Sequence, residues 1–414
     1  MLSISTIGAP LVSELSENFK FFVILHNNDI HGRFDETGAN SINCQKVDAE
    51  NNQCFGGLAR VAHVVRDYRN RSAAGEIPPV LFLNAGDTYT GTPWFSAYKD
   101  KIVSDFMNLL RPDAISLGNH EFDEGLGSLG SFLREVDCPV LIANMQLDGE
   151  PDLAVEALKK SVVLEVDGRK VGVIGYLTLM TQQEVTGRGV KFIDEITSIN
   201  KEAEILKTAG VNIIVALGHS GIEKDKEIAA QCSEVDLVVG GHCKFRKLLQ
   251  SFCRLKISIF VAHTFLFTGE EPDIDKSEGE YPTVITQSSG KKVPIVQAYA
   301  FSKYLGRLSV EFDSNGDLVK FEGHPILLNG DVPKDPEALQ LLEKYRKGVA
   351  KVEQNFVGST KVFLDGTCRR HECNLGNFIT DAMVHFCATN NEIEKCNNTS
   401  IAFVQGGAIR TSIS

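Results

Sequence analysis

Polar residues of the kinds that bind divalent metal ions follow apolar runs at five places in the sequence. The runs "FFVIL", "PVLFL", "DAISL", "VNIIVAL" and "VDLVVGG" each lead into aspartate, asparagine or histidine, often after a glycine that permits a sharp turn. The candidate residues are Asp29, His31, Asp87, Asn119, His120, Asp123, His219 and His242. One such histidine alone is more typical of a structural residue, but the repeated position at strand ends indicates a shared site.

These side chains predict a site for two divalent metal ions. Aspartate and histidine suit Zn²⁺ or Mn²⁺, and asparagine adds a neutral oxygen. Two ions about 3.5–4 Å apart need a bridging carboxylate, and Asp87 in its Gly-Asp step is the natural candidate. Cysteine is absent from the set, which argues against a structural zinc site.

The apolar runs have the length of β-strands, and several are apolar throughout, as in strands covered on both faces. They occupy 21–25, 79–83, 113–117, 139–143, 171–177, 211–217 and 235–241. Helical patterns at 57–70 and 198–210 lie between them. This alternation predicts a layered α/β (α+β) domain over 20–330.

Two Asx-Gly pairs predict β-hairpins and therefore antiparallel strands beside the parallel ones. Asp167-Gly168 separates two strand patterns, and Asn315-Gly316 separates two more.

Other parts of the 414-residue chain lie outside this domain, because one ordinary core cannot occupy such a length. Residues 1–19 have no clear pattern. A turn and a single helix starting near Pro336 predict a linker over 331–356. A second α/β pattern then covers 357–414.

The net charge of −12 argues against nucleic-acid polymers as partners, since their phosphates need a basic surface. It allows small phosphorylated substrates, because metal ions can supply positive charge locally. No apolar run is long enough to span a membrane. Residues 1–20 make a poor secretory signal, yet three close cysteine pairs favour disulfides and an extracellular location. The pairs are Cys44/Cys54, Cys368/Cys373 and Cys387/Cys396.

The motifs D-x-H, G-D, G-N-H-E-x-D, G-H and G-G-H, in this order, resemble the calcineurin-type metallophosphoesterases. The wider segments "NDIHGR", "NAGDTYTGTPWF" and "LGNHEFDEG" resemble the 5′-nucleotidase/apyrase family in particular. The resemblance implies a four-layer αββα metallophosphatase domain, a linker helix, and a C-terminal domain that binds the nucleoside.

The same resemblance implies a role for each matching residue. One ion would be held by Asp29, His31 and the second histidine of a G-G-H-x-H motif, and the other by Asn119, His219 and His242, with Asp87 bridging. His120 and Asp123 match a catalytic dyad, in which an imidazolium stabilises the transferred phosphoryl group. The carboxylate of the dyad orients the imidazolium ring. Water activated by the ions would be the nucleophile. The expected ions are Zn²⁺, with Mn²⁺, Mg²⁺ or Ca²⁺ as alternatives.

Recognition of the substrate is expected from the C-terminal pattern, through Arg369, Gln405 and Arg410. Gln405 stands where the family motif "NGGGIR" has asparagine, since this chain reads "QGGAIR". The family continues beyond this motif to an aromatic pair that stacks on the base, so the resemblance predicts that the sequence is part of a longer chain.

Hydrolysis of a nucleoside 5′-monophosphate such as AMP is the function that these motifs favour. An apyrase acting on ATP and ADP shares every motif and remains the nearest alternative. A catalytically impaired nucleotide-binding protein is the second alternative, because the metal motif is interrupted and the aromatic pair that stacks on the base is absent from this sequence. The oligomeric state stays open.

The interruption lies at 243–262, where the family motif would place the second histidine two residues after His242. That histidine is expected to be His263. The segment carries five lysines and arginines and no acidic residue. The codons of Cys-Lys-Phe at its start and Phe-Val-Ala at its end can hold splice signals, and excision would leave a serine in frame. We therefore expect a retained intron. A true insertion is the alternative, and it could return His263 to the site only if its two ends lie close together.

Replacing 243–262 by one serine should raise phosphatase activity and metal affinity, because His242 and His263 would then lie on one short turn that orients both side chains. Activity and metal titration of the shortened and unshortened proteins test this, and sequencing of the mature message is the control. If the message retains the segment and the shortened protein gains nothing, the segment is a true insertion.

Overall fold

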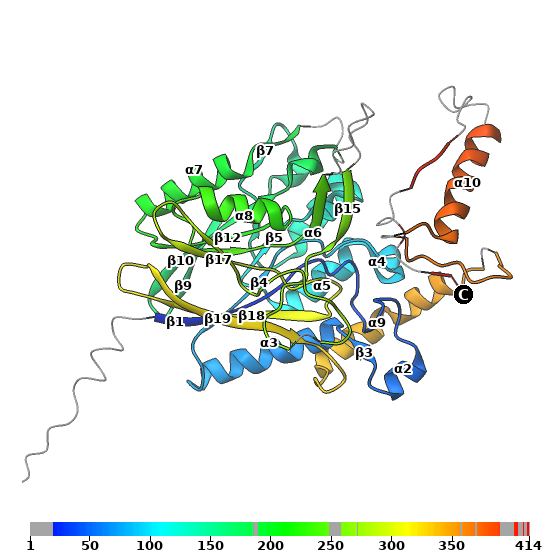
Figure 1. Ribbon diagram of the computed structural model, residues 1–414, viewed down its shortest axis with the longest axis horizontal. Helices are drawn as coiled ribbons and strands as arrows, with labels where there is room; N and C mark the ends of the chain where they lie inside the picture. The colour runs from blue at the N-terminus through cyan, green and yellow to red at the C-terminus, as the bar shows by residue number, and fades with distance from the viewer. Residues whose placement is uncertain are drawn as a thin grey trace, which may run out of the picture.

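The computed structural model describes most of the chain. The described residues are 20–183, 185, 189–247, 258–270, 272–356, 358–368, 371–389, 401–404, 409 and 412–413. Two large β-sheets face one another in the main body of the molecule, with helices on their outer sides (Figure 1).

The first sheet has seven strands in the order β19-β18-β1-β4-β5-β6-β8. Strands β1 to β8 of this sheet run parallel, and β18 and β19 complete it in antiparallel fashion. The strands are β1 (Lys20–Asn27), β4 (Val80–Asn84), β5 (Ala114–Ser116), β6 (Val140–Leu141), β8 (Leu158–Lys159), β18 (Tyr304–Phe312) and β19 (Leu318–Leu327).

The second sheet has six strands in the order β16-β17-β13-β12-β10-β9. Its central strands are parallel, and antiparallel pairs close both edges. The strands are β9 (Ser161–Val166), β10 (Arg169–Leu177), β12 (Ile213–His219), β13 (Leu237–Val239), β16 (Thr283–Thr286) and β17 (Lys292–Val296).

Apolar side chains join these sheets and the helices into four layers. Leu83 of the first sheet and Ile174 of the second belong to one buried cluster, together with Ala203 of a helix outside the second sheet. Phe82, the neighbour of Leu83, points the other way into a cluster with Phe106. The covering helices are α3 (Leu58–Ala73), α5 (Asp100–Leu110), α6 (Gly125–Glu135), α7 (Glu195–Thr208) and α8 (Ile222–Gln231). The αββα architecture that the family resemblance implies is confirmed.

Shorter elements fill the connections. They are β2 (Thr37–Gly38), α2 (Lys46–Glu50), β3 (Cys54–Phe55), α4 (Pro93–Tyr98), η1 (Asn119–Phe122), β7 (Met145–Leu147), η2 (Pro151–Leu153), η3 (Leu179–Gln183) and β11 (Val190–Phe192). The runs 113–117, 139–143 and 235–241 form shorter strands than expected, since residues at both ends of each run lie outside the paired segment.

Both predicted hairpins are present. Asp167 and Gly168 join β9 to β10 with φ values of 50° and 72°, the left-handed pair that a two-residue turn of this kind requires. Asn315 and Gly316 lie in a longer turn between β18 and β19.

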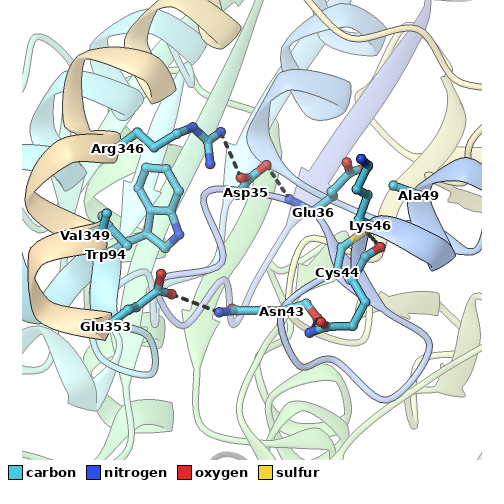
Figure 2. A pocket seen from close by; sticks show the side chains of 12 residues that line it. Asp35, Glu36, Asn43, Cys44, Lys46, Ala49, Trp94, Arg346, Val349 and Glu353 are labelled. Atoms are coloured by element: carbon cyan, nitrogen blue, oxygen red, sulfur yellow. Dashed lines mark hydrogen bonds and ion pairs between the residues drawn. The ribbon is translucent and has the colours of Figure 1, made fainter. Parts of the chain in front are cut away.

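The predicted linker helix is α9 (Pro336–Glu353), and it packs firmly on the first domain. Leu342 and Tyr345 are buried in the same cluster as Phe106. Beside them, the Arg346 guanidinium lies 5.4 Å from the centre of the Trp94 ring and 3.2 Å from Asp35 (Figure 2).

A polar pocket of about 270 Å³ lies between α9, α4 and the loop that carries Cys44. Asn43 spans one side of it with a 3.0 Å hydrogen bond to Glu353 (Figure 2). The pocket lining includes no predicted metal ligand, so it is separate from the predicted site.

The described part of the C-terminal pattern contains α10 (Asn374–Thr389), which stands apart from the two sheets in Figure 1. A small cluster of Cys373, Leu375 and Ile409 anchors the start of this helix. The expected disulfides Cys44–Cys54 and Cys368–Cys373 are formed. The third expected pair cannot be followed, since Cys396 lies outside the described residues. No helix in the described ranges is long and apolar enough to cross a membrane.

Asp335 offers a test of how the linker helix is held. Its carboxylate accepts 3.0 Å hydrogen bonds from the backbone of Glu337 and Ala338 and lies 3.0 Å from Arg66. Asp335→Ala should lower the free energy of unfolding by about 1–2 kcal/mol in urea titrations, because it removes the helix cap. Asp335→Asn keeps a capping oxygen and should lose clearly less. Equal stability of the alanine variant would contradict this role.

Candidate active site

The polar residues expected to share a site come together at one edge of the two sheets. Strands β1, β4 and β5 are parallel neighbours, so the loops that follow them leave the first sheet at the same edge. Strands β12 and β13 do the same in the second sheet, which faces the first. The loops therefore meet between the two layers.

The backbone at this edge is unusual, because four candidate ligands have left-handed conformations that side-chain-bearing residues rarely adopt. The φ values are 52° at Asp29, 49° at His31, 57° at Asp87 and 82° at His242. Strain of this kind persists only where the surrounding structure imposes it, and it concentrates at functional sites.

Asp29, His31 and His263 form one buried cluster, with ligand atoms all within 4.8 Å of one another. His263 Nε2 lies 3.1 Å from Asp29 Oδ1 and 3.0 Å from His31 Nε2. Two imidazole nitrogens and a carboxylate oxygen that point at one spot are a donor set suited to a divalent ion.

Asp87, His219 and His242 form a second buried cluster of the same size. His219 Nε2 lies 2.8 Å from Asp87 Oδ2, and the rings of His219 and His242 are 5.0 Å apart. Asn119 Oδ1 is buried and has no hydrogen-bond partner among the described residues, which fits an oxygen kept for a metal ion. Asp87 also lies 3.8 Å from His31 of the first cluster, as a bridging carboxylate should.

Backbone carbonyls fix the orientation of two of these rings. Nδ1 of His31 lies 3.2 Å from the Thr90 carbonyl oxygen, and Nδ1 of His219 lies 2.6 Å from that of Ala85. Since a carbonyl can only accept, each Nδ1 must donate, and Nε2 is left to bind a metal. This is the usual support for metal-binding histidines.

The pKa shifts at this site follow from its two buried carboxylates. Burial opposes a charged ring at His219, but Asp87 and Asp29 outweigh it and raise the pKa of His219 to about 10. Burial also opposes the charged form of Asp87, yet His219 and His120 hold the pKa of that carboxyl far below its usual range. Burial lowers the pKa of His242 to about 3, so this ring is neutral. A divalent ion would have to displace the proton of His219.

His120 and Asp123 lie at the open side of the clusters. His120 Nδ1 is 2.8 Å from Asp123 Oδ2, and their side chains are 24% and 29% exposed, whereas the ligand side chains are almost fully buried. The backbone nitrogen of His120 also donates to Asp87 Oδ1 at 3.0 Å. The pair can therefore reach a substrate while remaining tied to the buried carboxylate.

Glu121 is a supporting residue that the sequence reasoning missed. Its buried carboxylate accepts backbone hydrogen bonds of 2.7–3.2 Å from Asp87, Thr88, Tyr89 and Gly118. It therefore joins the two loops that carry the candidate bridging carboxylate and Asn119. Its position inside the G-N-H-E-x-D motif is the feature of the sequence that could have identified it.

Two glycines allow the loop that carries Asp87 and the loop that carries Asn119 to approach one another closely. A Cβ at Gly86, where φ is 80°, would lie 2.5 Å from the backbone nitrogen of Gly118. A Cβ at Gly118 would lie 2.1 Å from Asp87 Oδ1. Only glycine fits at either position.

The interrupted motif closes through a β-hairpin. Strands β14 (Cys243–Lys247) and β15 (Ser258–His263) pair antiparallel, and Cys243 lies opposite His263. The condition for a true insertion is thus met, because the two ends are adjacent and His263 reaches the first cluster. The premise that this segment frees His263 from His242 is wrong, since the strand pairing restores a constraint between them.

The residues expected to bind the substrate cannot be placed. Arg369, Gln405 and Arg410 all lie outside the described residues.

Comparison with known proteins agrees with this geometry. Residues 22–243 match the family model of the calcineurin-like phosphoesterases, and 352–414 match the 5′-nucleotidase C-terminal domain. The chain is 40% identical to snake venom 5′-nucleotidase from Naja atra, covering 94% of this chain and 69% of that protein. The chain belongs to the 5′-nucleotidase family.

Other known proteins are similar to this chain over the same region. The chain is 46% identical to the protein 5NUC of Lutzomyia longipalpis and 41% identical to human 5′-nucleotidase, over 94% of its length in both cases. It spans 66% and 64% of those proteins, about two thirds of their length. A 5′-nucleotidase precursor from Thermus thermophilus has the same fold, with a TM-score of 0.78 and 32% identity over 95% of this chain and 71% of that one.

The two clusters predict that the folded protein binds about two divalent ions per chain, since His263 reaches its place. Asp87→Asn should reduce both occupancies, because one carboxylate faces both clusters. Metal analysis after dialysis against a weak chelator measures this. Asp123→Asn is the matched control, since Asp123 lies outside both clusters and should keep the ions. Full metal content in Asp87→Asn would rule out a bridging role.

Proposed function

We propose that this protein is a two-metal phosphohydrolase that converts nucleoside 5′-monophosphates to nucleosides and phosphate. The observation that carries the proposal is the convergence of two buried His/Asp clusters beside an accessible His–Asp pair. Clusters of this composition suit divalent ions, and a pair of ions is suited to phosphate esters. Zn²⁺ is the ion that the nitrogen-rich donor set favours.

In this proposal Asp29, His31 and His263 hold one ion, and Asn119, His219 and His242 hold the other. Asp87 faces both. When bound, two such ions supply polarisation of the phosphoryl oxygens and lower the pKa of a bound water. The chain keeps the site dry and rigid, because the ligands are buried and their rings and carboxylates are held by backbone contacts.

His120 is proposed to stabilise charge on the phosphoryl group or to give a proton to the leaving oxygen. Its Nδ1 faces Asp123, so Nε2 is the atom aimed at the substrate. A carboxylate on Nδ1 favours the protonated ring and fixes its plane. No cysteine or serine nucleophile is needed in this scheme.

A nucleotide substrate is supported by the match of 352–414 to the 5′-nucleotidase C-terminal domain and by relatives named 5′-nucleotidases. Arg369, Gln405 and Arg410 are proposed to contact it. An extracellular location is supported by the disulfide Cys44–Cys54 and by relatives from snake venom.

Phosphate release from AMP, ADP and ATP tests the function directly. We expect AMP to be hydrolysed fastest, with loss of activity on chelation and recovery when Zn²⁺ or Mn²⁺ is added. Release from ATP and ADP without release from AMP would instead identify an apyrase. A protein that binds divalent ions and hydrolyses none of the three would contradict the proposal.

His120→Asn should lower kcat by roughly 10²–10⁴, the range for a positioned proton-transfer or charge-stabilising group. A ring nitrogen of His120 lies within 4.8 Å of ligand atoms of His31 and Asp87. We nevertheless expect the metal content to stay unchanged, because Asp123 engages Nδ1 of His120 and each buried cluster keeps its own ligands in the variant. Steady-state kinetics together with metal analysis measure both. Wild-type turnover would remove His120 from the mechanism, and loss of metal would make it a ligand.

A further inference from the structure

Thr90 touches both the His–Asp pair and the first metal cluster. Its hydroxyl donates to Asp123 Oδ2 at 2.6 Å, and its carbonyl oxygen accepts from Nδ1 of His31 at 3.2 Å. The Asp123 oxygen that it contacts is the one 2.8 Å from His120 Nδ1. A single loop residue therefore joins a candidate metal ligand to the candidate catalytic dyad.

The backbone of Thr90 is strained in a way that calls for an explanation. Its φ is 55°, in the left-handed region, which is a rare conformation for a β-branched residue. Glycine would adopt it without cost, and the same loop uses glycine at Gly86 and Gly91, where φ is also positive. A threonine held in this conformation indicates that its side chain has a task that glycine cannot perform.

The exposure of the dyad suggests what that task is. Asp123 is 29% exposed, so water can compete for its carboxylate and favour other rotamers. A hydroxyl and an imidazole that share one oxygen define the plane of the carboxylate and leave it one good orientation. Hydrogen bonds to a charged acceptor are the stronger kind, which suits this purpose.

We propose that Thr90 is a positioning residue that holds Asp123 against His120 and so aims the His120 ring at the phosphoryl group. The inference rests on the proposed phosphohydrolase function and adds a residue to it. Thr90 acts through its hydroxyl on turnover, whereas its carbonyl supports His31 whatever the side chain is. Changes of the side chain should therefore affect kcat and spare the metal ions.

Three substitutions of Thr90 separate positioning from folding. Thr90→Val keeps the shape of the side chain and removes the hydroxyl. It should lower kcat roughly 10- to 100-fold with little change in KM, because one charge-assisted hydrogen bond is lost. Thr90→Ser keeps the hydroxyl and should restore most of the activity. Thr90→Gly relieves the strain, so its thermal unfolding midpoint should be no lower than wild type, while kcat falls as in the valine variant.

A double-mutant cycle tests whether Thr90 acts through Asp123. In an Asp123→Ala background, Thr90→Val should cause little further loss of kcat, because the group that it positions is gone. AMP and p-nitrophenyl phosphate are used in parallel, with metal analysis of every variant.

Several outcomes would contradict the positioning role of Thr90. Valine and glycine variants with wild-type kcat would overturn the proposal. The proposal would also be overturned if Thr90→Val lowered kcat as much in the Asp123→Ala background as in the wild-type protein. Loss of bound metal in the variants would also contradict it. A wild-type protein inactive on both substrates would instead refute the phosphohydrolase function, and the role of Thr90 with it.

Discussion

Asp29 and Asp87 are carboxylates buried between two β-sheets, with 0% and 1% of their surface exposed. Moving a carboxylate out of water is costly unless a cation or several hydrogen bonds replace the water. Around them the structure places imidazole rings, and the two carboxylates raise the pKa of one of these, His219. A site of this kind is most stable when divalent ions carry the balancing charge. The parallel strands and the loops that follow them bring several candidate ligands to these two carboxylates.

The loops that carry the candidate ligands have little conformational freedom. Candidate ligands occupy left-handed backbone positions, and the loops that carry them touch so closely at Gly86 and Gly118 that only glycine fits. Glu121 then joins the same loops through backbone hydrogen bonds. Its neutral form is favoured by burial beside Asp87, since burial first and that charge second raise the pKa of Glu121 to about 7. The charge of His219 and the backbone hydrogen bonds from Gly118 and Thr88 act in the opposite direction.

Much of this arrangement could be predicted from the sequence, because parallel strands deliver the residues that follow them to one sheet edge. Asp29, Asp87 and His219 were identified in this way, and the structure brings them together. The position of His263 could not be derived from spacing, since it depends on the pairing of Cys243 with His263 across a hairpin. The contact of Thr90 with Asp123 also left no signal, because a threonine in a loop is ordinary until its φ and its partner are known.

We propose that two divalent ions occupy the two clusters, with Asp87 between them. Anomalous diffraction from crystals grown with Zn²⁺ or Mn²⁺ tests it most directly. We expect two anomalous peaks about 3.5–4 Å apart. One should contact Asp29, His31 and His263, and the other should contact Asn119, His219 and His242. A single peak, or a structure in which His263 points away from its cluster, would contradict it.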